Sequence, residues 1–178
     1  CLYCSFSSYA LGAYKDYVDS YLDALIKERE FVSESMKGRR LDTVYFGGGT
    51  PTTLSAAQLD RLITALKELF DIDSCHEFTV EAGRPDSITR DKLKVLKAHN
   101  VGRISINPQT MNQQTLDLIG RKHTVEQIKN VYSMAREEGF NNINMDIILG
   151  LVGEDVDEVA HTLSEIEAMK PESLTVHS

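Results

Sequence analysis

Two cysteines at the start of the chain, Cys1 and Cys4, form a Cys-x-x-Cys pair with Tyr3 between them. This spacing occurs in half of a zinc site, in redox-active dithiols and by coincidence. A thioredoxin-type dithiol opens a helix directly after a strand, whereas the segment Ser5–Leu11 has the composition of a loop. Taken alone, the pair leaves zinc binding and coincidence open and makes a thioredoxin-type site the weakest of the three explanations.

Other residues with chemical potential follow short apolar runs. They are Gly47, Gly48, Gly49 and Thr50, then Glu81, Asn107, Gln109, Asp146 and His177. The glycine run forms either a tight turn or a close backbone approach to a ligand, and no Lys follows it as in the usual phosphate-binding loop. An acid at the end of an apolar strand, such as Glu81 or Asp146, is costly if buried alone. Each acid therefore needs a cationic or hydroxyl-bearing partner, which a purely structural salt bridge to Lys or Arg would also supply.

Alternating strands and helices must position these residues. Strands are predicted at Thr43–Phe46, His76–Glu81, Gly102–Ile106, Asn142–Leu149 and Ser173–His177. Helices are predicted at Val18–Val32 with Gly38 as a stop, from Ser55 to Phe70, and at Thr89–His99, Asn112–Ile119, Thr124–Glu138 and Asp155–Met169. Their apolar residues recur at helical spacing. Three helix starts have the spacing of a capping box, at Ser55 with Gln58, Thr124 with Gln127 and Asp155 with Glu158.

Strict alternation of strand and helix at the length of βαβ units predicts a parallel sheet in an α/β fold. The pattern allows either an open doubly wound sheet or part of a barrel. In both architectures the C-terminal ends of the strands share one rim, and ligands bind there. The polar residues described above lie at these strand ends, so this rim is the predicted site.

Composition narrows the classes of function. The 178 residues carry 19 Lys and Arg against 27 Asp and Glu, a net charge of −8, which disfavours a general nucleic-acid surface. The longest apolar run, Ile147–Val152, is far shorter than the ~20 residues of a membrane span. Three cysteines without a visible secretory signal favour a cytoplasmic protein, with Cys75 as a structural free thiol. Since the chain begins with Cys1 and not Met, we expect a fragment of a longer protein.

Six segments, taken together and in order, resemble the radical S-adenosylmethionine (SAM) enzymes. They are Cys1–Cys4, Gly47–Thr52, Glu81, Arg103–Thr110, Gly120–His123 and Asn144–Leu151. More narrowly, they are similar to the oxygen-independent coproporphyrinogen III oxidases, which are also called coproporphyrinogen dehydrogenases. Two positions depart from the commoner pattern: Asn107-Pro108 stands in place of Gly-Val, and Val152 stands in place of Pro.

The resemblance implies two cofactors, a [4Fe-4S] cluster and SAM. Cys1 and Cys4 match the last two metal-binding cysteines of the family's Cys-x-x-x-Cys-x-x-Cys motif, and the first would precede this chain. Three thiolates leave one iron open, and in the family SAM binds there. By resemblance, the SAM-binding residues are Tyr3, Gly47, Gly48, Gly49, Thr50, Glu81, Gln109, Arg121 and Asp146. Among them Tyr3 would lie near the adenine, and the forked donors of Arg121 suit a carboxylate.

The resemblance also implies the architecture and the activity. Residues 1–178 would form a single radical SAM core domain fragment, a partial (β/α)6 TIM-like barrel whose first strand precedes Cys1. The implied reaction is the oxidative decarboxylation of coproporphyrinogen III to protoporphyrinogen IX in haem biosynthesis, with electrons from a donor such as flavodoxin or ferredoxin. Two alternatives remain open: a haem chaperone on the same fold, and a phosphate-binding barrel enzyme with an incidental Cys-x-x-Cys.

Overall fold

A single parallel sheet organises the molecule. The computed structural model describes residues 2–4, 12 and 14–178. The strands are β1 (Thr43–Phe46), β2 (Glu77–Glu81), β3 (Arg103–Ser105), β4 (Ile143–Ile148) and β5 (Ser173–His177). All neighbouring pairs are parallel, and the order in the sheet is the order in the chain. A doubly wound sheet reverses its strand order partway. The observed order therefore excludes that alternative and confirms the partial barrel.

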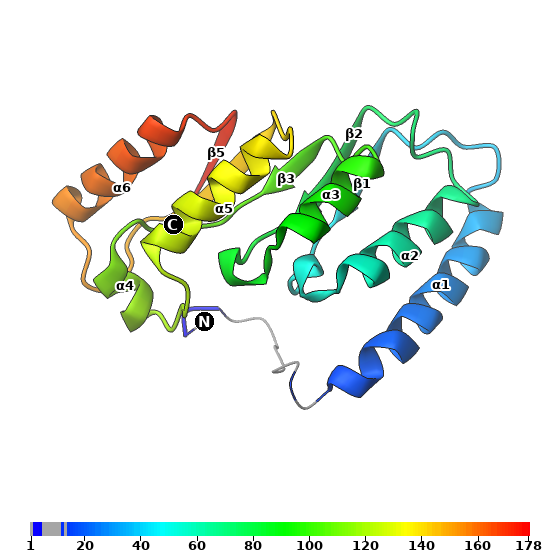
Figure 1. The fold of residues 1–178 in the computed structure, drawn as a ribbon, viewed down its shortest axis with the longest axis horizontal. Coiled ribbons are helices and arrows are strands. Elements are labelled where there is room, and N and C mark those ends of the chain that lie inside the picture. Colours follow the sequence, from blue (N-terminus) through cyan, green and yellow to red (C-terminus); the bar gives the residue numbers. More distant parts are fainter. Residues whose placement is uncertain (1, 5–11, 13) are drawn as a thin grey trace.

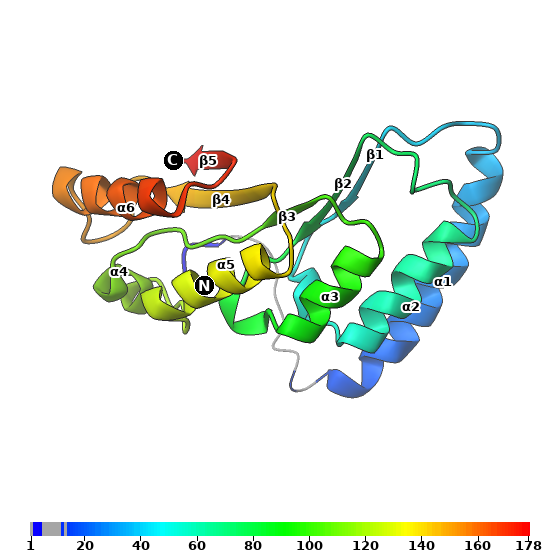
Figure 2. The ribbon, with the colours of Figure 1, turned by 45° about the horizontal axis from the view of Figure 1, so that its top comes forward.

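Helices cover one face of this sheet. They are α1 (Val18–Ser35), α2 (Ala56–Lys67), α3 (Arg90–Ala98), α4 (Gln113–Leu118), α5 (Val125–Glu137) and α6 (Val156–Met169). Right-handed crossovers between successive strands place the connecting helices on the same side. Figures 1 and 2 show α1, α2, α3 and α5 following one another along the sheet. Single 3-10 turns precede α1, α2 and α3.

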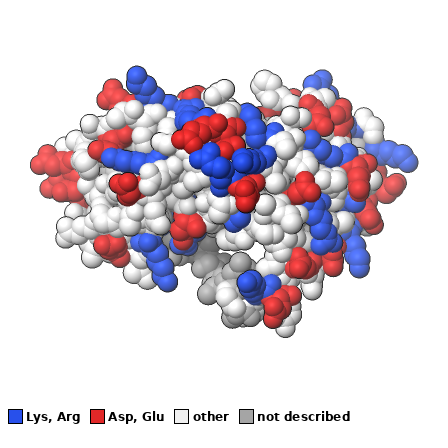
Figure 3. Space-filling model, in the orientation of Figure 1, with Lys and Arg blue, Asp and Glu red and all other residues white. Residues whose placement is uncertain are grey.

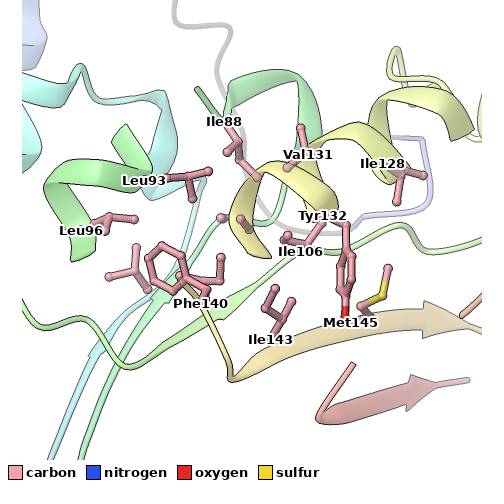
Figure 4. Packing of buried hydrophobic residues seen from close by; sticks show 14 of the residues in the cluster. Ile88, Leu93, Leu96, Ile106, Ile128, Val131, Tyr132, Phe140, Ile143 and Met145 are labelled. Carbon is pink, nitrogen blue, oxygen red and sulfur yellow. The ribbon is translucent and has the colours of Figure 1, made fainter. Parts of the chain in front are cut away.

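The core lies between the sheet and these helices. Alternate strand residues point to it, as the two-residue period of a strand requires: Val80, Ile104 and Ile143 are fully buried. Figure 4 shows Leu93 and Leu96 of α3 on one side of Phe140, near Ile143, and residues of α5 beyond them. The other alternate residues of each strand point away from the helices, and they are the ones available for a site.

The predicted elements are confirmed, with ends displaced by a few residues. Both hydrogen bonds of the capping box are present at Ser55 with Gln58, Thr124 with Gln127 and Asp155 with Glu158. The first long helix ends at Ser35, and Gly38 lies in the turn beyond it with a φ of 77°. Local sequence therefore determines where these three helices begin, because the cap satisfies otherwise unpaired N–H groups.

Two surface properties bear on partners. Among the described residues, no helix combines the length and apolar character that a bilayer crossing requires. On the face shown in Figure 3, acidic and basic side chains are interspersed over the helices. That face therefore offers no continuous basic surface of the kind that a nucleic-acid backbone needs.

Candidate functional site

Polar side chains from all five strands line the sheet face that points away from the helices. They are Tyr45 of β1, Glu77, Thr79 and Glu81 of β2, Arg103 and Ser105 of β3, Asn144 and Asp146 of β4, and Ser173, Thr175 and His177 of β5. Arg103 Nη1 lies 3.5 Å from Glu77 Oε1, and its Nη2 donates to Ser173 Oγ at 3.4 Å. A closed TIM barrel fills its interior mainly with bulky apolar residues. This polar lining is instead suited to a ligand.

Glu81 ends β2 and is held by a hydroxyl group. The Tyr45 hydroxyl of the neighbouring strand donates a short hydrogen bond to Glu81 Oε1. Burial, the bond to Glu81 and the nearby negative charge of Asp146 all raise the pKa of Tyr45. The predicted need for a cationic or hydroxyl-bearing partner is thus met by a hydroxyl, and among the described residues Glu81 forms no ion pair. Its negative charge remains available to a cationic ligand.

Asp146 lies on the same face, on β4. Asn144 Nδ2 donates to its Oδ1 at 2.5 Å, and His177 Nε2 lies 3.7 Å from its Oδ2. Asn144 is in turn fixed, because its Oδ1 accepts from Ser173 Oγ at 2.8 Å. Three strand-borne side chains therefore orient the Asp146 carboxylate, which is half-buried. The sheet brings Asp146 close enough to Tyr45 for its charge to act on that hydroxyl, so the two predicted acids share one site.

Gln109 lies at the same rim in an unusual backbone conformation. Its φ is 72°, in the left-handed region that few non-glycine residues adopt. Its N–H donates to the Asp146 carbonyl at 2.9 Å, and its own carbonyl accepts from Ile148 N–H at 3.0 Å. These two bonds fasten the segment after β3 to β4 and compensate for the strained turn. Gln109 is 6% exposed, so its position is fixed before any ligand binds.

The glycine run leads from β1 to the start of α2. Gly48 and Gly49 have φ values of 75° and 54°, which a side chain would disfavour. A Cβ on Gly47 would come within 2.2 Å of Tyr45 Cε1. Glycine at position 47 therefore leaves room for the tyrosine ring that reaches Glu81. The run exposes its backbone at the rim, as close approach to a ligand requires.

Arg121 connects the cysteine segment to the rim. Its Nη1 donates to the Gly83 carbonyl at 3.2 Å, and its Nη2 donates to the Tyr3 hydroxyl at 3.0 Å. Leu2 N–H also donates to the Ile119 carbonyl at 2.9 Å, beside this site. The side chain is buried, with the residue 7% exposed, and among the described residues Arg121 has no carboxylate partner. Burying an unpaired cation is costly, so this site fits the carboxylate of a ligand.

The structure describes two of the three cysteines, Cys4 and Cys75. Cys4 is an exposed free thiol, next to Tyr3, whose hydroxyl contacts Arg121. Cys1 and the segment Ser5–Leu11, predicted to be a loop, lie outside the described residues. Within the described ranges, no three His, Cys, Asp or Glu side chains gather into a metal site. An exposed Cys4 fits one thiolate of a cluster, and Arg121, which contacts the neighbouring Tyr3, fits the carboxylate of SAM. Cys75 is half-buried, and burial raises its thiol pKa.

Three residues of the site were not predicted from the sequence: Tyr45, Gly83 and His123. Tyr45 could have been found, because the alternation along β1 places it on the same face as Glu81 once the strands pair. Gly83 acts through its backbone carbonyl, which no side-chain pattern reveals. His123 lies fully buried beside Arg121. It ends the segment Gly120–His123 of the resemblance, but the sequence assigned a role only to Arg121 in that segment.

Comparisons with known proteins agree with the resemblance seen in the motifs. The family model described as the radical SAM superfamily matches residues 1–166. The oxygen-independent coproporphyrinogen-III oxidase-like protein HemZ of Bacillus subtilis is 48% identical over 181 residues, covering 100% of this chain and 36% of HemZ. The heme chaperone HemW of Lactococcus lactis is 36% identical over 178 residues, covering 100% of this chain and 45% of HemW.

Among solved structures, coproporphyrinogen III oxidase (HemN) from Escherichia coli, described as a radical SAM enzyme, resembles this fold with a TM-score of 0.83. The sequence identity is 34%, and the match covers 89% of this chain and 36% of that chain. The chain thus spans less than half the length of these relatives.

Proposed function

Since the chain belongs to the radical SAM superfamily, which uses a [4Fe-4S] cluster and SAM, we propose that it is the SAM-binding core of an oxygen-independent coproporphyrinogen III oxidase. The observation that carries the SAM site is Arg121, a buried cation without a carboxylate partner among the described residues. The names of two of the relatives, HemZ and HemN, support the choice of substrate. Glu81 and Asp146 lie on the same face of the sheet, where their carboxylates would pair with the positive groups of SAM.

Each candidate residue has a specific task in this proposal. Cys1, Cys4 and a cysteine in the preceding part of the protein hold the cluster. Arg121 binds the carboxylate of SAM through its free N–H groups, since each terminal nitrogen uses only one hydrogen on Gly83 or Tyr3. Glu81 accepts from a positively charged or hydroxyl group of SAM, held in place by Tyr45.

The remaining candidates complete the pocket. Asp146 and Gln109 accept from or donate to the ribose, and the exposed backbone of Gly48 and Gly49 meets the amino group of the methionine portion. When bound, the reduced cluster and SAM supply an organic radical that removes a hydrogen atom from the substrate. The chain itself contributes orientation and the exclusion of water around that radical. The resulting substrate radical would lose carbon dioxide from the propionate and pass one electron to a one-electron acceptor, which leaves a vinyl group.

Product formation by the full-length protein tests this function. The protein is reconstituted anaerobically with iron and sulfide, and supplied with SAM, coproporphyrinogen III and reduced flavodoxin or ferredoxin, the class of electron donor that we propose for a cytoplasmic enzyme. Protoporphyrin, measured by fluorescence after oxidation of the product, should appear only when SAM is present. Cleavage of SAM without any change in the porphyrinogen would contradict this choice of substrate.

A haem chaperone is the second candidate. The observation that favours it is the match to HemW, which extends over the whole of this chain. The cofactor site would be the same, so the SAM-binding residues do not distinguish the two functions. Stable binding of haem by the full-length protein and its transfer to an apo-haemoprotein, without decarboxylation of coproporphyrinogen III, would favour the chaperone.

A further inference from the structure

Unpartnered polar atoms concentrate behind the rim. Among the described residues, the buried side-chain nitrogen and oxygen atoms without a hydrogen-bond partner are Arg29 Nη1, Asn107 Oδ1, Arg121 Nε and both ring nitrogens of His123. Three of these residues lie near one another: Arg121 contacts Gly83, and a Cβ on Gly83 would lie 3.3 Å from Asn107 Nδ2. The charge of Arg121 also acts on His123. Buried polar groups are almost always paired, so this cluster needs an explanation.

His123 is the least exposed member of the cluster, at 0%. Burial lowers its pKa to about 4, and the positive charges of Arg121 and Arg84 act in the same direction. Asp86 and the Pro108 carbonyl act in the opposite direction but more weakly than the burial. The ring is therefore neutral near pH 7. A neutral imidazole has one N–H donor and one acceptor nitrogen.

The unpaired groups around the ring are complementary to it. Arg121 Nε carries an unused donor, and the Pro108 backbone, which raises the pKa of His123, offers a carbonyl acceptor near the ring. We propose that His123 is a positioning residue for Arg121: one ring nitrogen accepts from Arg121 Nε–H through an ordered water, and the other donates to Pro108. This chain of bonds satisfies Arg121 Nε and both nitrogens of His123. Arg121 and His123 are buried and polar, and such groups are the usual partners of a buried water.

The consequence for the site is a fixed guanidinium plane. Gly83 and Tyr3 hold its two ends, and the bond to His123 fixes the third nitrogen. One hydrogen on each of the two terminal nitrogens then remains for the carboxylate of the ligand. Pro108 directly precedes Gln109, so the same bonds brace the strained turn at the rim. The inference rests on the proposed binding of the SAM carboxylate by Arg121.

Binding of SAM to the full-length, reconstituted protein without a reductant tests this role, because no turnover occurs. Four variants are compared by equilibrium dialysis: R121M, H123L, H123Q and the double variant R121M/H123L. We expect Kd to rise about 30-fold for R121M and about tenfold for H123L, since each loses a charge-assisted contact. H123Q keeps a donor and an acceptor and should remain within about threefold of wild type. In the R121M background, H123L should have no further effect.

The outcomes distinguish the role of Arg121 in binding SAM from the role of His123 in positioning Arg121. Unchanged affinity in R121M would refute the proposed role of Arg121 itself. If R121M loses affinity, three results would overturn the positioning role of His123 alone. They are wild-type affinity in H123L, a loss in H123Q equal to that in H123L, and an H123L effect that persists in the R121M background. A crystal structure of the wild-type protein gives an answer that does not depend on variant folding. It should show a water between Arg121 Nε and His123, and a dry gap there would also overturn the inference.

Discussion

Removing the negative charge of Glu81 should weaken SAM binding without disturbing the fold. In Glu81→Gln the amide oxygen can still accept from the Tyr45 hydroxyl, so the local structure is kept. A cation about 4 Å from a carboxylate at an effective dielectric of ~20 is attracted by roughly 4 kcal/mol. Part of this is offset by desolvation, and losses measured for hydrogen bonds to charged groups are about 1.5–3 kcal/mol. The expected rise in Kd is therefore about 10- to 150-fold.

Glu77 provides a matched control on the same strand. It lies on the same face, four residues before Glu81, which is about 13 Å at the rise of a strand. Its Oε1 accepts from Thr79 at 2.8 Å and lies 3.5 Å from Arg103 Nη1. Equilibrium dialysis with the reconstituted, unreduced protein should show a Kd near wild type for Glu77→Gln. Wild-type affinity in Glu81→Gln, or an equal loss in both variants, would refute the assignment of the rim as the binding site.

Three further changes have defined outcomes. Gly47→Ala should displace the Tyr45 ring, since the Cβ of residue 47 would lie 2.2 Å from Tyr45 Cε1. The variant should raise the Kd for SAM as much as Tyr45→Phe does. Wild-type affinity in Gly47→Ala would contradict this role of the glycine. Burial lowers the pKa of His123 to about 4, so between about pH 6.5 and pH 4 only the unfolded chain takes up the proton, and the free energy of unfolding should fall by roughly 3 kcal/mol. Urea unfolding of His123→Gln should lack this pH-dependent loss. Parallel pH dependences for the variant and the wild type would contradict it. Phe140→Ala, at a fully buried core position, should lower the free energy of unfolding by about 3–5 kcal/mol, and a loss below about 1 kcal/mol would be inconsistent with the packing.

The fold was largely predictable because its signals are local. The three capping boxes and the alternation of short apolar runs with amphipathic segments fix the elements without any long-range contact. Local patterns could not decide between an open doubly wound sheet and part of a barrel. Both architectures share the same βαβ units, and only the observed strand order separates them.

The site was predictable only in part. Glu81, Asp146 and Gln109 lie at strand ends, so the topology alone brings them to one rim. The partners that fix them are set by strand register and by backbone groups: Tyr45 reaches Glu81 across a strand pair, and Gln109 is held by backbone bonds to β4. The alternation along β1 places Tyr45 on the face of Glu81 only once the strand pairing is known, and the backbone bonds of Gln109 leave no pattern in the sequence. The assignment of these residues to SAM remains a prediction.

Reductive cleavage of SAM by the full-length protein tests the central claim most directly. Free methionine and 5′-deoxyadenosine are measured after anaerobic reconstitution and reduction with dithionite. The wild-type protein should form both, Cys4→Ser should form neither and lose the visible absorption of the cluster, and Cys75→Ser, a change at a half-buried thiol, should behave as wild type. Cleavage that persists in Cys4→Ser, or a reconstituted wild-type protein that leaves SAM intact, would contradict the account.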